Sequence, residues 1–345
     1  MIGNTDSTSS GDVSEKAMSL YNNAFVMDAH AGVFPDPRVD LSLLNDWRDN
    51  GVNYLSINVG FDVKDWQQTM AILAAYRHYV LGNTDTLVLA GSIDDIERAN
   101  RQNKLAISFD IEGMNALNCN LDMVDIYHAL GVRQMLFAYN LDNEAACGCH
   151  DGNSGLTDFG KAIVQRMNDL GVLVDCSHVS HRTSMDLIET SAKPVVFSHS
   201  NPCGVWRHQR NIEDNQIKAC ADTGGVIGIN GMGIFLGEND IRIETIVDHI
   251  CYVAELVGPD HIGFGFDYSP DNNLDVGAIL RSRPDYWPEG NLYDTPNIGH
   301  AGPLLLPYIV DLLLEREFSE LEISGILGGN FKRVITSVWI DRIYE

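Results

Sequence analysis

The sequence predicts a single (β/α)8 barrel, an α/β fold of the TIM type, on three observations. The chain has 345 residues and is 45% hydrophobic, which is enough apolar material for a large core. Short β-branched runs alternate with longer amphipathic runs, as is typical of a parallel sheet covered by helices. Eight such units fit within about 250 residues, the usual size of this barrel.

Eight strands are expected, each of them a short apolar run. Their predicted ranges are 24–30, 52–59, 105–112, 132–140, 171–178, 194–199, 224–230 and 261–267. Between them lie helical patterns such as 92–104, which opens on the capping pair Ser92 and Asp95, and 157–170, which Gly171 ends. The competing architecture is an open doubly wound sheet, but the first turn, HAGVFPDP, lacks the glycine-rich phosphate fingerprint of that fold.

One domain is expected over residues 1–345, because no low-complexity linker divides the chain. We predict a polar tail over about 1–15, a long loop over 270–302, and closing helices over 303–316 and 319–327 within the C-terminal segment 303–345. The first dozen residues do not resemble a signal peptide, and no apolar run reaches the length of about 18 residues that a membrane span needs.

The charge balance favours a small-molecule partner. With 23 Lys and Arg against 48 Asp and Glu, the net charge of −25 disfavours binding to nucleic acid or to a membrane surface. Seven cysteines, an odd number, indicate reduced thiols and a cytoplasmic location. The group Cys147, Cys149 and His150 could hold zinc, but without a second cysteine pair nearby we favour free loop thiols.

Polar residues stand at the carboxyl end of every predicted strand. They are His30, Asn58, Glu112, Tyr139 with Asn140, His178, His199, Asn230 and Asp267. The carboxyl ends of parallel barrel strands meet at one mouth, so these side chains should converge there. Imidazole and carboxylate together predict a metal site, because both are ligands of zinc and of similar ions.

The stretches around these residues resemble the renal (membrane) dipeptidase family, zinc peptidases on an amidohydrolase-like barrel. The most specific stretches are IEG at 111–113, the run at 155–183, SHSN at 198–201, QRNIED at 209–214, GGVIGIN at 224–230, IGFGFD at 262–267 and ILGGNF at 326–331. The resemblance covers nearly the whole chain. It implies that Glu112 bridges two zinc ions, that His178 and His199 hold one of them, and that His30 serves the other.

The resemblance also implies roles in substrate binding and catalysis. The equivalent of Arg210 binds the carbonyl or carboxylate end of the substrate, and the equivalent of Asp267 holds the substrate amine and moves a proton. Tyr139 and Asn140 stand where the family contacts the substrate, and a water bridging the metals attacks the scissile carbonyl. A homodimer is also expected from the resemblance alone.

Two residues depart from the family pattern. The family has His-x-Asp where this chain has His30, Ala31 and Gly32, so one metal has lost a carboxylate ligand. Asp28, Asp36 or Asp40 could replace it, and the sequence does not choose among them. We therefore expect one tight zinc site and a second that is weak or absent.

The second departure is Tyr139, which replaces a family histidine and carries no positive charge near neutral pH. The prediction is a metal-dependent hydrolase of a dipeptide or a related small amide, with Glu112, Tyr139 and Asp267 as catalytic residues. Alternatives are a hydrolase of a non-peptide amide or lactam in amino-acid or methylated-amine catabolism, a lactonase or deaminase, and a catalytically impaired barrel that binds a ligand.

Overall fold

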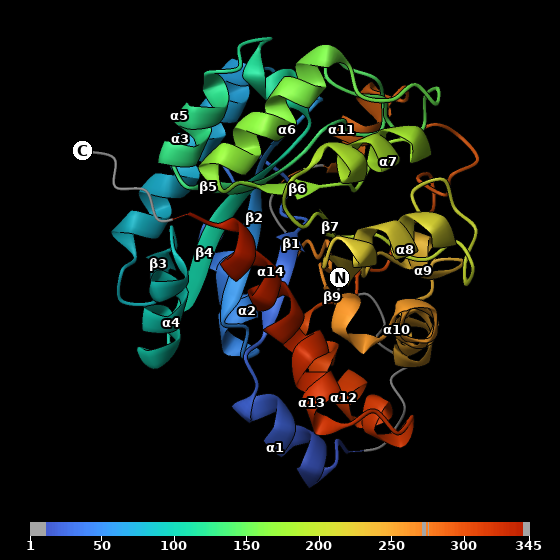
Figure 1. The fold of residues 1–345 in the computed structure, drawn as a ribbon. Helices are drawn as coiled ribbons and strands as arrows, with labels where there is room; N and C mark the ends of the chain where they lie inside the picture. Colours follow the sequence, from blue (N-terminus) through green and yellow to red (C-terminus); the bar gives the residue numbers. More distant parts are fainter. Residues whose placement is uncertain (1–11, 271–273, 275, 341–345) are drawn as a thin grey trace.

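The computed structural model describes residues 12–270, 274 and 276–340, and they form a closed parallel barrel surrounded by helices (Figure 1). The strands are β1 Met27–Ala31, β2 Tyr54–Phe61, β3 Leu87–Leu89, β4 Leu105–Glu112, β5 Val132–Leu136, β6 Leu173–Asp175, β7 Val196–Phe197, β8 Val226–Ile229 and β9 Ile262–Phe264. Their order is β2-β1-β9-β8-β7-β6-β5-β4-β3, and a β2–β4 pairing closes the ring. The predicted fold class is confirmed.

Eight of these strands match the eight predicted ranges, and β3 is the one that the sequence analysis missed. It pairs only with the first residues of β4, from Leu105 to Ile107, while β5 pairs with the later residues of the same strand. The three-residue strand lies outside the ring of eight. Its sequence, LVL, is too short to show a period of its own.

Helices lie around the barrel and at its two ends (Figure 1). They are α1 Glu15–Asn23, α2 Asn45–Asp49, α3 Trp66–Gly82, α4 Ile93–Arg101, α5 Met123–Ala129, α6 Asp158–Leu170, α7 His181–Thr190, α8 Asp214–Asp222, α9 Gly233–Leu236, α10 Ile243–Val257, α11 Val276–Ser282, α12 Leu306–Glu315, α13 Glu320–Ser324 and α14 Asn330–Val338. The expected caps are present, since Ser92 and Asp95 form a capping box and Gly171 ends α6 in a left-handed conformation. Of the helices in the described part of the chain, none has both the length and the apolar character needed to cross a bilayer.

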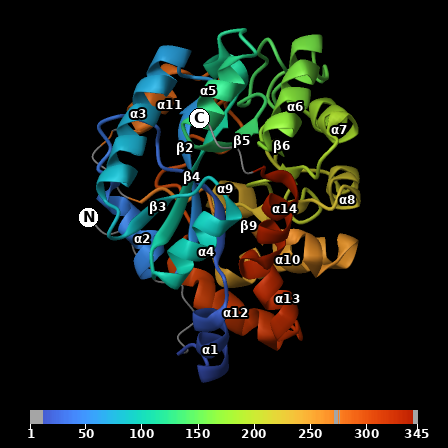
Figure 2. The ribbon, with the colours of Figure 1, turned by 60° about the vertical axis from the view of Figure 1, so that its left-hand side comes forward.

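The first described helix of the chain packs against a helix in its C-terminal part. Helix α1 packs beside α12, and both lie at the lower edge of the molecule in Figures 1 and 2. Ser14 stabilises this contact with two hydrogen bonds, since its backbone N–H and its hydroxyl both donate to the Asp311 carboxylate. Part of the predicted 270–302 loop forms the short helix α11, and residues 271–273 and 275 lie outside the described residues.

Helix α14 closes the amino-terminal end of the barrel. Its residues Phe331 and Val334 are buried in one cluster with Met27, Tyr54 and Val226, which stand at the starts of their strands. The ring of Phe331 lies where a Cβ on Gly263 would stand, 2.4 Å away, so only glycine allows this close approach. With this end filled, the opposite, carboxyl-terminal end is left to form a site.

Several predicted strands extend too far. The ranges ending at 140, 178 and 267 were expected to be strand throughout, whereas β5, β6 and β9 end at Leu136, Asp175 and Phe264. Asn140, His178 and Asp267 have positive φ values of 64°, 64° and 52°, which no strand can accommodate. These polar residues therefore stand in tight turns just beyond the strands, and such conformations are concentrated at functional sites.

The approach of β8 to the turn after β7 depends on Gly228. A Cβ there would lie 1.9 Å from the carbonyl oxygen of Ser198, the residue that precedes His199. We expect Gly228→Ala to destabilise the fold toward the upper end of the roughly 1 to 3 kcal/mol typical of overpacking, because backbone must move. Gly82→Ala is the matched control, since a Cβ added at this last residue of α3 would meet nothing within 4 Å. Urea unfolding of both variants checks this, and equal stabilities would contradict it.

Candidate metal centre

Three histidines from the ends of three other strands converge on one oxygen of Glu112, its Oε1. His178 Nε2 and His199 Nε2 each lie 3.3 Å from it, and His30 Nε2 lies 3.6 Å from it. Glu112 is the last residue of β4 and His30 is in β1, while His178 and His199 follow β6 and β7. The structure thus brings together all four residues that the sequence predicted as metal ligands.

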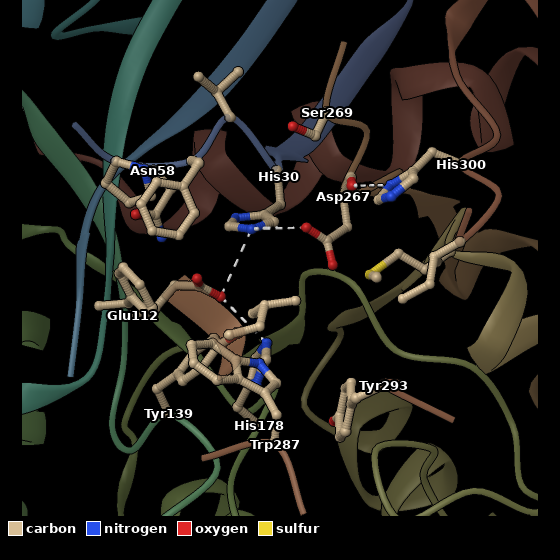
Figure 3. Close-up of a pocket in the computed structure, with 18 of the residues that line it drawn as sticks. His30, Asn58, Glu112, Tyr139, His178, Asp267, Ser269, Trp287, Tyr293 and His300 are labelled. Carbon is tan, nitrogen blue, oxygen red and sulfur yellow. Dashed lines mark hydrogen bonds and ion pairs between the residues drawn. The ribbon is translucent and has the colours of Figure 1, made fainter. Parts of the chain in front are cut away.

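These groups form part of the wall of a cavity of about 490 Å³ at the carboxyl end of the barrel. Figure 3 shows His30, Glu112 and His178 pointing toward one another, with Tyr139, Trp287 and Tyr293 around them. Much of the remaining wall is apolar or aromatic and includes Phe34, Phe61, Phe235, Leu280 and Ile298. Of the described residues that line the cavity, none is Lys or Arg.

Each of the three imidazoles is held by its Nδ1 atom. His30 Nδ1 lies 3.2 Å from Asp110 Oδ1, and His178 Nδ1 lies 2.7 Å from Asn140 Oδ1. His199 Nδ1 lies 2.7 Å from Ser198 Oγ, whose own proton goes to the buried carboxylate of Asp175. Because Asn140 and Ser198 act as acceptors, Nδ1 carries the proton in the neutral rings of His178 and His199, and Nε2 of each is left with a bare lone pair.

The bare lone pairs face one another. His178 Nε2 and His199 Nε2 are only 2.8 Å apart, and Glu112 Oε1 between them is buried without a hydrogen-bond donor. Three acceptors in contact repel unless a cation lies among them. Zinc ligands lie about 3.3 Å apart when bonds of 2.0 to 2.2 Å point to the corners of a tetrahedron, so this donor set fits a zinc-sized ion.

Burial favours the uncharged forms of Glu112, His178 and His199, whereas nearby carboxylates favour the charged form of His30. It raises the pKa of Glu112 to about 8, an effect that nearby His30 and Arg210 partly offset. Burial, helped by Arg210 or His30, also lowers the pKa of His178 and of His199 well below the usual value, so both rings stay neutral. For His30, burial alone would lower the pKa, but Asp110, Glu112 and Asp267 raise it well above its ordinary value.

Of the four residues predicted to contact the substrate, Tyr139 and Asp267 line the cavity, whereas Asn140 and Arg210 do not. Tyr139 lines the cavity and stacks on His178 with ring centroids 4.3 Å apart. Asn140 does not reach the cavity, because its side chain is fully buried and bonds His178 and the Tyr286 carbonyl. Arg210 is buried and donates a hydrogen bond to the His199 carbonyl at 3.1 Å. It lines a separate cavity, and of the described residues only His178 lines both cavities.

The three acids considered as replacements at position 32 bond to groups outside the centre. Asp28 accepts from the Trp47 indole and from the backbone of Phe266. Asp36 pairs with Arg38, and Asp40 caps the turn at Ser42.

The loop group of Cys147, Cys149 and His150 is not arranged around a common point. Both ring nitrogens of His150 are taken, by Gln209 and by Tyr293. Burial raises the pKa of Cys149 to about 12, which favours the thiol over the thiolate that zinc binds.

Sequence analysis missed the acids behind the centre. Asp110 holds His30, and Asp175 holds His199 through Ser198. Asp62 links the turn after β4 to the turn after β5, because its carboxylate accepts hydrogen bonds from the backbone N–H groups of Asn115 and Tyr139. Only Asp110 left a signal, since it stands two residues before Glu112 and so on the same face of the strand.

The hydroxyl of Ser198 should matter for metal affinity. Ser198→Ala removes the acceptor of His199 Nδ1, so we expect metal to bind about 10 to 100 times more weakly, as is typical when a ligand loses its supporting hydrogen bond. Ser200→Ala is the control, because the Ser200 hydroxyl contacts Ser177 and no histidine ring. Competition against a chromophoric chelator measures both variants, and equal affinities would contradict the assigned tautomer.

The sequence of this chain is similar to those of known dipeptidases. The model of the membrane dipeptidase family, peptidase family M19, matches residues 48–277. A dipeptidase of Schizosaccharomyces pombe that has not been characterised is 31% identical over 225 residues, which are 63% of this chain. That match spans 54% of the fission yeast protein, so this chain aligns with about half of that relative.

Solved structures share the barrel. An amidohydrolase from Pseudomonas aeruginosa superposes with a TM-score of 0.85 at 28% identity, covering 94% of this chain and 99% of that one. A metallopeptidase from Rhodobacter sphaeroides, liganded with a phosphinate mimic of the dipeptide L-Ala-D-Ala, superposes with a TM-score of 0.73 at 18% identity. It covers 92% of this chain and 99% of its own, and at that identity it supports the fold alone.

Proposed function

This chain belongs to the membrane dipeptidase family, peptidase family M19, and from that premise we propose that it hydrolyses the amide bond of a dipeptide or a related small amide. Membership of this metallopeptidase family, together with the buried His/Glu/His group, makes the chain a metal-dependent hydrolase. The observation that carries the proposal is the pair of bare Nε2 atoms, on His178 and His199, that face Glu112 Oε1.

Zinc is the ion that we propose, held tightly by Glu112, His178 and His199. Two imidazoles and one carboxylate leave a fourth position open, as in catalytic zinc sites. A bound zinc ion supplies a water whose pKa is lowered to about 7 and polarises the substrate carbonyl. Its site lies at the base of a cavity large enough for a small molecule.

Protein groups around the cavity would orient the substrate. Asn58 Nδ2 is buried without a hydrogen-bond acceptor in the cavity wall, so it can donate to a substrate carbonyl. Tyr139, stacked on His178, can donate its phenolic proton to a developing oxyanion, since burial raises its pKa well above the ordinary value. Asp267 Oδ2 is held by Asn230 at 3.2 Å, which fixes a carboxylate able to take or deliver a proton.

The cavity wall favours one variant of this function, a small amide without a free carboxylate. Arg210, the expected carboxylate partner, lies behind His199, and the described cavity wall contains no Lys or Arg. The same wall is rich in aromatic side chains, which suit an apolar substrate body. We propose C-terminally blocked dipeptides, lactams and other neutral amides as substrates alongside free dipeptides.

The experiment is a substrate panel with zinc-loaded protein. Free dipeptides, their C-terminal amides and small lactams are compared by the release of amino acid, and ammonia is measured to detect deamination. The proposal predicts turnover that stops when zinc is removed, and kcat/KM at least as high for the blocked dipeptides as for the free ones. No turnover on any amide by protein shown to contain zinc would overturn it in favour of a binding barrel.

We also propose a cellular location and an oligomeric state for the protein. All seven cysteines are free, which supports a reducing compartment such as the cytoplasm. A homodimer remains a prediction that light scattering of the purified protein would test.

A further inference from the structure

Arg210 is a buried cation with an unused hydrogen-bond donor. The residue is 3% exposed, and its Nη2 donates to the His199 carbonyl at 3.1 Å. Its Cζ lies 5.3 Å from the centroid of the Phe235 ring, and its Nε is buried without an acceptor. Burying an unsatisfied donor of a charged group costs free energy, so this arrangement needs a structural cause.

Residues 287–293 separate the cavity that Arg210 lines from the metal cavity. Residues 289–291 line the Arg210 cavity, whose volume is about 730 Å³. Trp287 and Tyr293, which flank them, line the metal cavity instead. We call residues 287–293 the partition, because its two faces belong to two different cavities.

Tyr293 brings the partition close to Arg210. Figure 3 shows its ring in the wall of the metal cavity. The ring packs edge-on against Phe235, the same ring over which Arg210 lies, with centroids 6.2 Å apart. Burial and Cys149 raise the pKa of Tyr293 well above its ordinary value, and the charge of Arg210 opposes this rise. The guanidinium therefore lies within electrostatic range of the phenol that covers it.

Two histidines from other loops hold the partition in place. The Tyr293 hydroxyl lies 2.7 Å from His150 Nε2, and the Asn291 carbonyl lies 2.9 Å from His208 Nε2. His150 follows β5 and His208 follows β7. Each such hydrogen bond stabilises the arrangement by about 1 kcal/mol, so the Tyr293 ring is fixed in the cavity wall.

We propose that Tyr293 determines substrate specificity by closing the wall between the metal cavity and Arg210. A guanidinium binds a carboxylate strongly, because it offers two parallel N–H donors to the two oxygens. With the partition in place, the free carboxylate of a dipeptide does not reach this donor and meets a described wall without Lys or Arg. A C-terminally blocked dipeptide carries no such charge. The inference rests on the proposed function and names the residue behind its preference for neutral amides.

The competing explanation is that Tyr293 only packs the cavity wall. In that case the loss of its ring lowers activity on free and blocked dipeptides alike. If the ring instead shields Arg210, its loss joins the two cavities and favours the substrate that carries a carboxylate. The ratio of kcat/KM for a free dipeptide to kcat/KM for its C-terminal amide therefore distinguishes the two explanations.

Three tyrosine variants of the zinc-loaded protein provide the test. In Tyr293→Ala we expect this ratio to rise about tenfold or more, the lower end for a hydrogen bond to a charged group. Tyr293→Phe keeps the ring and removes only the hydroxyl, so its ratio should stay within about twofold of the wild type. Tyr252→Ala is the matched control, because the Tyr252 hydroxyl bonds Asp214 and the residue lines neither cavity.

Replacement of Arg210 shows whether its guanidinium is responsible. Adding Arg210→Met to Tyr293→Ala should return the ratio to the wild-type value. Arg210→Met alone should leave the ratio within about twofold of the wild type, whatever it does to the two rates separately. This second result tests the shielding even where Tyr293→Ala does not fold, which melting temperatures will show.

Three outcomes would overturn the inference. They are a folded Tyr293→Ala protein with an unchanged ratio, a double variant that keeps the gain, and a wild type whose ratio already depends on Arg210. If no variant hydrolyses any amide, the same two compounds are titrated as ligands by calorimetry, and their relative affinity should shift in the same way. Failure of the proposed function would leave this shift without turnover, whereas failure of the inference would leave turnover with an unchanged ratio.

Discussion

Replacing Glu112 with glutamine should lower kcat/KM for amide hydrolysis on the order of 10³-fold, since several kcal/mol of metal-derived stabilisation depend on this carboxylate. Its Oε1 lies within 3.6 Å of three imidazole nitrogens, so one substitution removes the anion at the middle of the proposed metal centre. A neutral amide oxygen is a poorer ligand for zinc than a carboxylate. Elemental analysis should show the metal content falling together with the activity.

The metal-free fold should survive this change. Burial already raises the pKa of Glu112 to about 8, and glutamine resembles the protonated acid that this environment favours. The control is Glu97→Gln, a half-exposed glutamate of α4 that pairs with Lys332 and does not line the cavity. A Glu112→Gln protein with full activity and full metal content would remove Glu112 from the mechanism.

Removal of the metal should lower the melting temperature. The two Nε2 atoms of His178 and His199, 2.8 Å apart, are left facing each other when no cation separates them. Zinc at 100 times its dissociation constant stabilises a folded protein by about 2.7 kcal/mol, or roughly 4 °C for a chain of this length.

Differential scanning calorimetry with a chelator, then with zinc restored, measures this shift. Magnesium should not replace zinc, because it is a hard cation that prefers an all-oxygen octahedral set. The shift should shrink in Ser198→Ala, whose His199 has lost its acceptor. Identical melting temperatures with and without zinc would mean that the cluster holds no ion.

The fold was predictable because its signal is repetitive. Each apolar strand pattern that lies between two helical patterns independently indicates a β/α unit. An error at a single strand therefore does not change the predicted fold class. The missed strand, Leu87–Leu89, is short and pairs only with the start of β4. The strand ends were placed too late because apolar residues continue to Phe137 and Ala138, while the left-handed turn at Asn140 depends on contacts that the sequence does not display.

The convergence of His30, Glu112, His178 and His199 was predictable from their places at the strand ends. The orientation of the three histidine rings was not predictable from the sequence. The tautomer of each ring is set by a partner from another strand or turn, as with Asp110 and His30, and such pairs depend on the register of the closed barrel. The contact between Asp267 and Gly32 joins residues more than two hundred positions apart, so local patterns carry no trace of it.

The most direct test of the central claim is anomalous scattering at the zinc edge from crystals grown with zinc. We predict a strong peak within bonding distance of Glu112 and of the Nε2 atoms of His178 and His199. A map with no peak there, or with peaks only at surface carboxylates, would contradict the assignment of these residues as a metal centre.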